Sequence, residues 1–458
     1  MQKMPLVVHY HGGNVVATLL AVLWLAACAT TPDDIDKWAD SVGGEERIAK
    51  AMADAKTEAS VRVYALVKLI KLGELDRMIG ALKELPEAER LATIKEGGPE
   101  IGKLFKVPDL KVQAAAKDAL YAFTKLGHQT LEEQSRQALL AWYSYNFMDK
   151  YAAGNFSAFH VLSDIGPAAG DVLVALLEKE PPAWAKVGKI IEKINDPGTT
   201  RKASDLILKW LVEQSPGFAP ELLQLATGVR DDRVTDFLDA FVAEKKNTMA
   251  SREAAFNTLS FNVSKRSLPV ALAIFTDRKE SIDLRGIAIE IIRKVGEPAN
   301  LQYVYPFLKD EAVKWAAFGT VLKIGGAAEL EKALGELNPT VVFWRDDYDI
   351  AQRHFMKFLS KDAAPTFVKF LKSPHIPLVT MALLGLQVHA DAALADAEVK
   401  PLFDNARQIK NYLDEKPYTI GELARAVHKA ILERPAGAVQ KPDGDADAAK
   451  DEAQEPAE

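Results

Sequence analysis

Apolar residues recur every three or four positions through most of the chain, as they do along one side of an α-helix. Val172, Leu173, Leu176 and Leu177 show this spacing. Alternation of apolar and polar residues, which is typical of a strand, is not sustained anywhere in the sequence. Ala, Leu, Lys and Glu fill many of the remaining positions, and these residues favour helices. The pattern therefore predicts an all-α protein.

Gly and Pro turns separate the predicted helices, which favours helix pairs stacked as a solenoid. Five segments close on an aliphatic residue and a glycine, and these glycines are Gly73, Gly127, Gly166, Gly296 and Gly325. An alanine stands eight positions before each glycine: Ala65, Ala119, Ala158, Ala288 and Ala317. A small residue at a fixed helical position lets two helices approach closely, and the glycine supplies a left-handed helix end.

A basic residue stands eleven positions before three of these glycines, at Arg62, Arg285 and Lys314. We expect these side chains to lie on the exposed flank of the helix. The pattern resembles the HEAT family of helical repeats, particularly the short bacterial variety, and the best matches run from Asp283 to Leu334. The resemblance implies a HEAT-like α-solenoid over residues 41–433 and says little about chemistry.

The first residues of the chain contain an apolar run, residues 14–25, that is shorter than the about 20 residues needed to span a bilayer. Its length suits a secretory signal peptide. The run ends in Leu25-Ala26-Ala27-Cys28, which resembles the lipobox of bacterial lipoproteins. The resemblance implies a signal peptide over residues 1–27 that is cleaved before Cys28, and a lipid-modified Cys28 that anchors the chain in a membrane.

The residue after Cys28 is Ala29 rather than Asp, and Asp at this position is the inner-membrane retention cue of bacteria with two membranes. The resemblance therefore implies a place in the cell envelope, at the outer membrane, facing the periplasm or the surface. Several acyl chains would supply stable anchoring. The alternative is that Cys28 is a small buried residue at the end of an apolar stretch.

Two segments flank the predicted solenoid. Residues 28–40 are predicted to form a short polar, lipidated tether. Residues 434–458 are rich in Ala, Pro, Gly, Asp and Glu with almost nothing large and apolar, so we expect a disordered acidic tail. Its Asp443–Asp447 run imitates the start of a calcium loop, but Ala448 replaces the glycine that such a loop requires.

Composition excludes several classes of function. The 458 residues are 48% hydrophobic and carry a formal net charge of −7, so there is no basic field to hold nucleic acid. A single cysteine excludes an intrachain disulfide and a cysteine-based zinc site. Metalloprotease, hydrolase and nucleotide-binding motifs are missing from the sequence. We therefore expect no catalytic residues, no metal and no cofactor.

Two aromatic clusters are the candidate partner-binding surfaces. The first is Trp142, Tyr143 and Tyr145, on a predicted helix that continues to Tyr151, and the second is Phe343, Trp344, Asp346 and Asp347. The alternative for the first cluster is burial between neighbouring repeats. The alternative for the second is that the aromatic residues pack under a long connection while the aspartates help to start the next helix.

These observations favour a non-enzymatic, lipid-anchored scaffold that binds another envelope protein through its concave face. One alternative is a periplasmic ligand-binding or peptide-binding protein that uses the Trp142–Tyr151 region. Another is an enzyme of the HEAT type such as a lyase, because some short HEAT proteins are bilin lyases.

Overall fold

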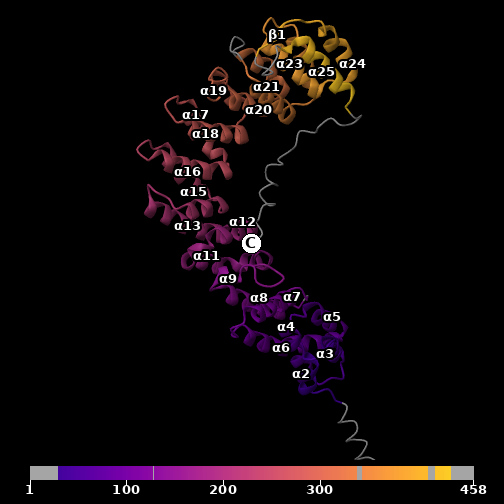
Figure 1. Cartoon of the computed structure of the whole chain (residues 1–458). Helices are drawn as coiled ribbons and strands as arrows, with labels where there is room; N and C mark the ends of the chain where they lie inside the picture. Colours follow the sequence, from indigo (N-terminus) through magenta and orange to yellow (C-terminus); the bar gives the residue numbers. More distant parts are fainter. Residues whose placement is uncertain (1–28, 127, 338–342, 411–417, 435–458) are drawn as a thin grey trace, which may run out of the picture. The chain divides into compact units, whose positions relative to one another are not determined.

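A computed structural model describes residues 29–126, 128–337, 343–410 and 418–434. The predicted signal peptide, Cys28 and residues 435–458 of the predicted tail lie outside the described residues. The described chain is almost entirely helical and falls into two compact units (Figure 1), unit 1 up to Leu206 and unit 2 from Ile207 onward.

Unit 1 is built from short helices joined by tight turns. In chain order they are α2 (Pro32–Ala39), α3 (Gly44–Ala53), α4 (Ala59–Leu72), α5 (Leu75–Glu84), α6 (Glu87–Leu104), α7 (Leu110–Phe123), α8 (Gln129–Tyr143), α9 (Phe147–Lys150), α10 (Ala158–Ile165), η1 (Gly166–Ala169), α11 (Gly170–Lys179), η2 (Pro181–Ala183) and α12 (Trp184–Ile194). Helix α13 (Pro197–Gln214) contains the boundary between the two units.

Unit 2 continues in the same manner. Its elements are α14 (Pro220–Gly228), α15 (Asp232–Ala243), α16 (Met249–Phe261), η3 (Lys265–Ser267), α17 (Leu268–Thr276), α18 (Ile282–Val295), η4 (Pro298–Asn300), α19 (Leu301–Val304), η5 (Tyr305–Phe307), α20 (Lys314–Glu336), α21 (Arg345–Phe358), η6 (Lys361–Ala363), α22 (Ala364–Phe370), α23 (Ile376–His389), α24 (Ala392–Leu394), η7 (Ala395–Val399), η8 (Lys400–Leu402), β1 (Gln408–Ile409), β2 (Tyr418–Thr419) and α25 (Ile420–Leu432). The two short strands pair in antiparallel fashion.

Successive helices of unit 2 form stacked pairs. Helix α15 packs on α16, α17 on α18 and α22 on α23, and Figure 1 shows the pairs following one another along the unit. The second helices also pack on one another in chain order, from α16 through α18, α20, α21 and α23 to α25. This is the stacking of an α-solenoid, and it confirms the fold class predicted from the sequence.

The alanines of the repeat pattern lie where the helices meet. Ala65, Ala119, Ala158, Ala288 and Ala317 are all fully buried, as the prediction of close helix approach requires. The glycines behave less uniformly. Gly73 ends its helix in the left-handed conformation, with φ 78°. Gly296 has φ −67°, so the prediction of a left-handed end is wrong there.

Helix α20 shows a different use of glycine. Its residues run without a gap from Lys314 to Glu336, but Gly326 has φ 60° and ψ −148° and turns the chain inside this span. The first half of α20 therefore completes one helix pair and the second half begins the next. The predicted end at Gly325 is displaced by one residue, because Gly326 is the position that takes the positive φ.

The basic residues of the repeat pattern are buried, so the prediction that they lie on an exposed flank is wrong. Arg62, Arg285 and Lys314 are 4–6% exposed. The Arg285 Nε atom donates to the carbonyl of Phe275 at 3.2 Å, at the end of the preceding helix. A second guanidinium nitrogen donates to Asp310 at 2.8 Å, in the following pair. Arg285 is therefore buried because it binds a helix-end carbonyl and a carboxylate of the next pair. Arg62 instead donates to the carbonyls of Ala55 and Thr57 and to the Thr93 hydroxyl. Lys314 pairs with Glu311 and lies 3.8 Å from Asp347.

The prediction of a polar tether through residue 40 is wrong for residues 32–39, which form helix α2. The Thr31 hydroxyl accepts the Asp34 N–H, and the Asp34 carboxylate accepts the Thr31 N–H at 3.0 Å. This capping box, with Pro32 at the first helical position, is a helix-start signal. Ile35 is fully buried, and α2 packs against α3 and α4. The helix is therefore part of unit 1.

One apolar stretch of unit 1, residues 158–179, is long and apolar enough to cross a membrane by length and composition. It consists of α10, η1 and α11, and Gly166, with φ 71°, interrupts it. Val161, Leu162 and Leu173 are fully buried. The stretch therefore packs as part of the helical core.

Candidate functional site

The first predicted aromatic cluster is mostly buried. Trp142 and Tyr143 are at most 2% exposed, whereas Tyr145 is 50% exposed. Helix α8 ends at Tyr143 and the chain turns at Asn146, with φ 48°. The prediction of one helix through Tyr151 is therefore wrong. Burial within the fold, the alternative interpretation, describes Trp142 and Tyr143.

Lys150 fixes this turn. Its Nζ atom donates to the carbonyls of Trp142 at 2.5 Å and Tyr145 at 2.7 Å, and it lies 3.3 Å from the centroid of the Tyr145 ring. Burial lowers the pKa of Lys150 to about 8. The exposed Tyr145 ring is therefore held by a structural lysine.

A second buried lysine lies in the same unit. Lys117 forms an ion pair with Asp118, and both side chains are at most 4% exposed. Asp118 also accepts the Asn155 N–H at 2.7 Å, which holds the loop after α9. Burial lowers the pKa of Lys117 and raises that of the Tyr143 hydroxyl. These groups stabilise the loop after α9.

The second predicted cluster lies in unit 2. Phe343 is 2% exposed and Trp344 is 62% exposed. Asp347 accepts the Trp344 N–H at 2.8 Å and the Trp315 Nε1–H at 2.5 Å. Asp347 therefore starts helix α21, as the alternative interpretation proposed for the aspartates. Trp344 and Asp346 remain exposed.

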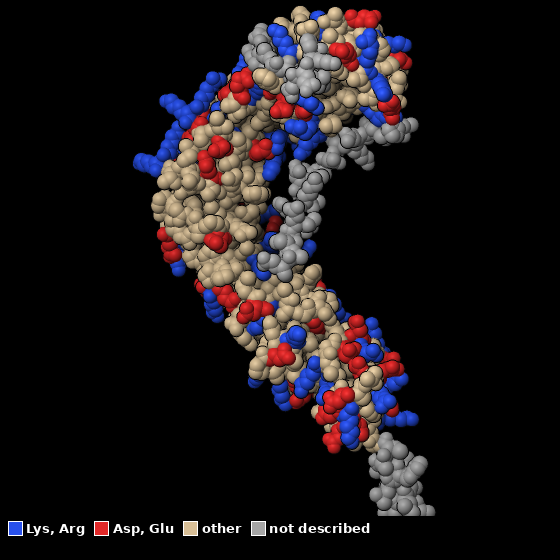
Figure 2. Space-filling model, viewed as in Figure 1, with Lys and Arg blue, Asp and Glu red and all other residues tan. Residues whose placement is uncertain are grey.

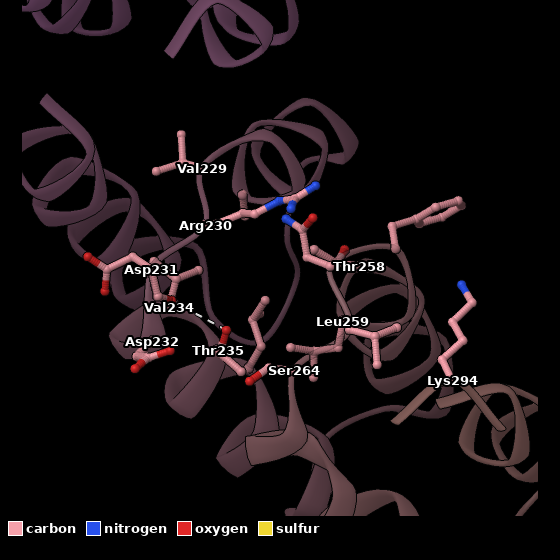
Figure 3. A pocket seen from close by; sticks show the side chains of 15 residues that line it. Val229, Arg230, Asp231, Asp232, Val234, Thr235, Thr258, Leu259, Ser264 and Lys294 are labelled. Carbon is pink, nitrogen blue, oxygen red and sulfur yellow. Dashed lines mark hydrogen bonds between the residues drawn. The ribbon is translucent and has the colours of Figure 1, made fainter. Parts of the chain in front are cut away.

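Unit 2 has a cavity of about 400 Å³ where the turn between α14 and α15 meets the end of α16 (Figure 3). Its apolar wall consists of Ala226, Val229, Val234, Leu238, Leu259, Phe261 and Val263. Its polar groups are Arg230, Asp231, Asp232, Thr235, Thr258, Asn262, Ser264 and Lys294. The lining therefore combines seven apolar residues with eight polar or charged ones, so a bound group could make both apolar contacts and hydrogen bonds.

Local hydrogen bonds fix the walls of the cavity. Asp231 caps α15 by accepting the Arg233 N–H at 2.8 Å. The Asn262 side-chain amide donates to the carbonyl of Thr227, which ties the end of α16 to the end of α14. The cavity is therefore preformed by secondary structure, because each wall is a helix end that is capped or tied.

The carboxylates around the cavity have basic partners, whereas its lysine binds a backbone carbonyl. Asp231 pairs with Arg233 at 3.0 Å, and Asp232 lies 3.6 Å from Arg266. Lys294 is exposed and donates to the carbonyl of Ser260 at 3.0 Å. In Figure 3, Lys294 lies on the side of the cavity opposite Asp231 and Asp232. A bound group would therefore meet paired carboxylates on one side and an amine on the other.

A groove between α16 and α18 adjoins the cavity, with a volume of about 580 Å³. Its lining residues are Glu253, Asn257, Ser260, Ile282, Asp283, Gly286, Ile287 and Glu290. The groove and the cavity meet at the end of α16, because Ser260 lines the groove and its carbonyl binds Lys294 of the cavity.

Two large apolar side chains are exposed along this surface. Phe261 of the cavity is 69% exposed and Ile282 of the groove is 61% exposed. Figure 2 shows few charged side chains over part of unit 2, around α15 and α16. Exposed apolar side chains beside a preformed hollow are a feature of protein and ligand contact surfaces.

Neither the cavity nor the groove was predicted from the sequence. Their residues come from several helices, and spacing along the chain does not bring them together. The one available signal was a pair of large apolar residues, Phe261 and Ile282, next to polar positions in helix ends. Among the described residues no group of three or more His, Cys, Asp and Glu side chains could hold a metal ion.

Comparison with known proteins yields no family. No family model and no curated protein matches the chain. Solved structures of the karyopherin Kap121p are similar at 12% sequence identity. One, bound to the extreme C-terminus of the protein phosphatase Cdc14p, covers 78% of this chain with a TM-score of 0.35, and another, bound to the SUMO protease Ulp1p, covers 86% with a TM-score of 0.37. The chain spans about half the length of these structures, 47% and 49% respectively.

Proposed function

We propose that this chain is a lipid-anchored scaffold of the bacterial cell envelope that binds a segment of another envelope protein on the surface formed by α14, α15, α16 and α18. The observation that carries the proposal is the preformed cavity with its adjoining groove. An apolar side chain of the partner would enter the cavity beside Phe261, and its neighbours would lie along the groove past Ile282.

The polar lining indicates how such a segment would be oriented. Glu253, Asp283 and Glu290 lie along the groove, whereas Lys294 lies at its junction with the cavity. A partner segment with basic residues along the groove and an acceptor group near Lys294 would match the charges of the groove and of its junction with the cavity. The groove would thus select one direction of the bound chain.

The anchoring part of the proposal rests on the sequence of the leader. Leu25-Ala26-Ala27-Cys28 has the order of residues that lipoprotein processing requires, and Cys28 is the single cysteine of the chain. Helix α2 begins at Pro32. Few residues would therefore separate the lipid from the folded units, and the scaffold would work close to the membrane surface.

The anchor can be tested by feeding cells an alkyne-tagged fatty acid and comparing the native chain with a Cys28→Ala variant. We expect label on the native chain, none on the variant, and loss of the variant from the membrane fraction. An unlabelled native chain would refute the anchor but not the binding surface.

The binding surface can be tested by mild crosslinking of cells followed by purification of the chain and identification of associated proteins. A Phe261→Lys, Ile282→Lys double variant should lose its envelope partner. A matched control is Val212→Lys, since Val212 is 63% exposed and lies outside both hollows. Equal recovery of the partner by both variants would contradict the proposed surface.

A second candidate function is the binding of a small ligand in the cavity alone. The volume of about 400 Å³ and the mixed lining favour it. Thermal shift measurements with the purified chain distinguish the two. A small molecule that raises the melting temperature of the native chain, and not that of the Phe261→Lys variant, would favour the ligand.

A further inference from the structure

The groove of unit 2 lies between two helices that run in the same direction. Near one end the Ser281 hydroxyl, which caps the start of α18, donates to Glu253 in the first half of α16 at 3.2 Å. Near the other end Lys294 of α18 donates to the carbonyl of Ser260, close to the end of α16, at 3.0 Å. The first half of each helix therefore lies beside the first half of the other, so the groove is a channel between parallel helices.

The groove and the adjoining cavity have the length of a short helix. The residues of α18 that line the groove run from Ile282 to Glu290, which is roughly 12 Å along the helix axis. Lys294, which lines the cavity, extends this distance to roughly 18 Å. About 12 residues of a bound helix cover the same distance, since each residue of an α-helix adds about 1.5 Å.

The wall that α18 contributes has a notch at Gly286. A Cβ added to this residue would meet no heavy atom within 4 Å, so there is open space above the backbone of α18. Ile282 and Ile287 also line the groove on this helix. A large apolar side chain of a partner could therefore enter the notch and contact both isoleucines.

The groove offers few hydrogen-bonding groups to the backbone of a bound segment. All of its lining residues lie on α16 and α18, whose backbone groups are largely bonded within each helix. The Ser260 hydroxyl donates to the carbonyl of Asn257 at 2.7 Å. The carboxylates of the groove accept hydrogen bonds only. Of the lining side chains, the amide of Asn257 is therefore the one that can donate to a carbonyl of the partner.

An extended segment is poorly matched to such a lining. Each of its residues brings a backbone N–H and a C=O, and a carbonyl that leaves water without a donor is destabilising. An α-helix bonds its own backbone groups and presents only side chains to its surroundings. The lining therefore fits the recognition of a helix in a groove.

Carboxylates at the start of the groove determine the charge of the occupant. Glu253 and Asp283 have no basic side chain within 4 Å among the described residues. Glu290, further along, forms an ion pair with Arg293. Asp283 also lies in the first turn of α18, where a carboxylate stabilises the helix. The uncompensated charge near the start of the groove is negative, so basic side chains of a partner complement it.

We propose that the occupant of this groove is an amphipathic α-helix of the partner protein, with apolar residues three or four positions apart and basic residues where it meets Glu253 and Asp283. This inference rests on the proposed function and deepens it, since it states the conformation and the residue pattern of the bound segment. One apolar side chain enters the notch at Gly286. Another, about two helical turns away, enters the cavity beside Phe261.

The spacing of crosslinked residues in the partner tests the conformation of the bound segment. A photoreactive amino acid replaces Asn257, Ile287 or Glu290 of the full chain in intact cells, and mass spectrometry identifies the partner residues that are linked. We expect these residues to lie on one face of a helix, about three, four or seven positions apart. Linked residues that alternate every second position would show an extended segment and overturn the proposal, although the proposed function would stand. No linked envelope protein would overturn both.

A variant that fills the notch tests the contact at Gly286. Gly286→Leu should keep the fold, because the added side chain enters open space and leucine favours a helix. We expect it to lower the crosslinking yield from position 257 by about ten-fold or more. Gly80→Leu is the matched control, since Gly80 lies inside α5 of unit 1 and a Cβ there also meets no heavy atom within 4 Å. Equal yields from the two variants would overturn the proposal.

Neutral variants test the basic part of the occupant. Glu253→Gln with Asp283→Asn should lower the crosslinking yield by about five-fold, as expected for the loss of partly exposed ion pairs. Asp33→Asn with Glu87→Gln, which neutralises two exposed first-turn carboxylates of unit 1, is the control and should leave the yield unchanged. An unchanged yield in the first variant would overturn the assignment of a basic helix, as would a linked helix without Lys or Arg.

Discussion

Buried charged residues join successive helix pairs of unit 2. Arg252 is 3% exposed, and two of its guanidinium nitrogens donate to the two carboxylate oxygens of Glu280 at 2.9 Å each. Its Nε atom also donates to the carbonyl of Val242, at the end of α15. Arg285 and Asp310 repeat this arrangement one pair later. Each guanidinium thus satisfies a helix end of its own pair and a carboxylate of the next.

Replacing Arg252 by Met should destabilise the protein by about 3 kcal/mol, because the buried Glu280 loses its two-pronged partner and keeps only Lys245, an exposed residue 3.7 Å away. Adding Glu280→Leu should recover most of this loss. Thermal and urea unfolding of the three proteins would measure it. Lys50→Met, at an exposed pair with Glu46 in unit 1, is the control and should change nothing measurable. If Arg252→Met lowers the free energy of unfolding no more than this control does, the buried ion pair does not stabilise the fold as described.

Asp239 is a second buried charge, and it is poorly compensated. Its Oδ2 atom accepts the Ser267 hydroxyl at 2.9 Å, and its Oδ1 atom has no hydrogen-bond partner among the described residues. Burial raises the pKa of Asp239 to about 6. A carboxyl group with a raised folded-state pKa favours folding at low pH, and this contribution is lost as the pH rises from about 4 to about 6.

Asp239→Asn should therefore raise the free energy of unfolding at pH 7.5, by on the order of 2 kcal/mol. The gain should shrink as the pH falls through 6 toward 4. Unfolding curves at several pH values would measure it, with Asp236→Asn, at an exposed position paired with Arg266, as the control. A gain that does not change with pH would show that the charge of Asp239 is not its cause.

Single residues also show which features of the structure could be predicted from the sequence. The burial of the alanines was predicted correctly, because a small residue at a fixed helical position commonly lies where two helices approach closely. The burial of Arg62, Arg285 and Lys314 was not predicted, because a basic residue in a helix is usually exposed. The carbonyl, hydroxyl and carboxylate oxygens that these three side chains bind are brought together only by the folded structure.

At the scale of elements, close approach of α20 and α21 depends on Gly319. A Cβ at this position would lie 2.6 Å from the His354 ring, which is too close for a real contact. Gly286, inside α18, is the opposite case, since a Cβ there would meet no heavy atom within 4 Å. The two glycines therefore share a helical conformation and differ in the space around them.

Gly319→Ala should destabilise the protein by about 1–3 kcal/mol, because His354 or the helices must move. Gly286→Ala should stabilise it by about 0.5–1 kcal/mol through the better helix propensity of alanine. The melting temperatures of the two variants measure the difference. A stabilising Gly319→Ala would mean that α20 and α21 are further apart than described.

The elements were predicted well where apolar spacing is regular and poorly at their ends. Residues 32–39 were predicted to be part of a tether because their acidic side chains are typical of a solvated segment. Thr31 and Asp34, which form the capping box of helix α2, are the sequence signal that predicts a helix there. The helix through Trp142 was extended too far, because the turn at Asn146 depends on Lys150 and its carbonyl partners rather than on a Gly or Pro.

At the scale of the whole molecule, the pattern of helix pairs predicted the fold, whereas the candidate site could not be predicted. Spacing of apolar residues determines which face of a helix is buried. It does not determine where two pairs leave a hollow, which depends on side chains from several helices at once. The cavity near Phe261 and the groove along Ile282 are such hollows, and the predicted aromatic residues Trp142, Tyr143 and Phe343 proved to be buried.

The most direct test of the proposed scaffold is site-specific photo-crosslinking in intact cells. A photoreactive amino acid replaces Asn257, which is exposed and lines the groove, or Lys246, which is exposed and lies outside it. We expect one envelope protein to be crosslinked from position 257 and not from position 246, with a lower yield in a Cys28→Ala chain. The same products from both positions, or none from position 257, would contradict the binding of an envelope protein in this groove.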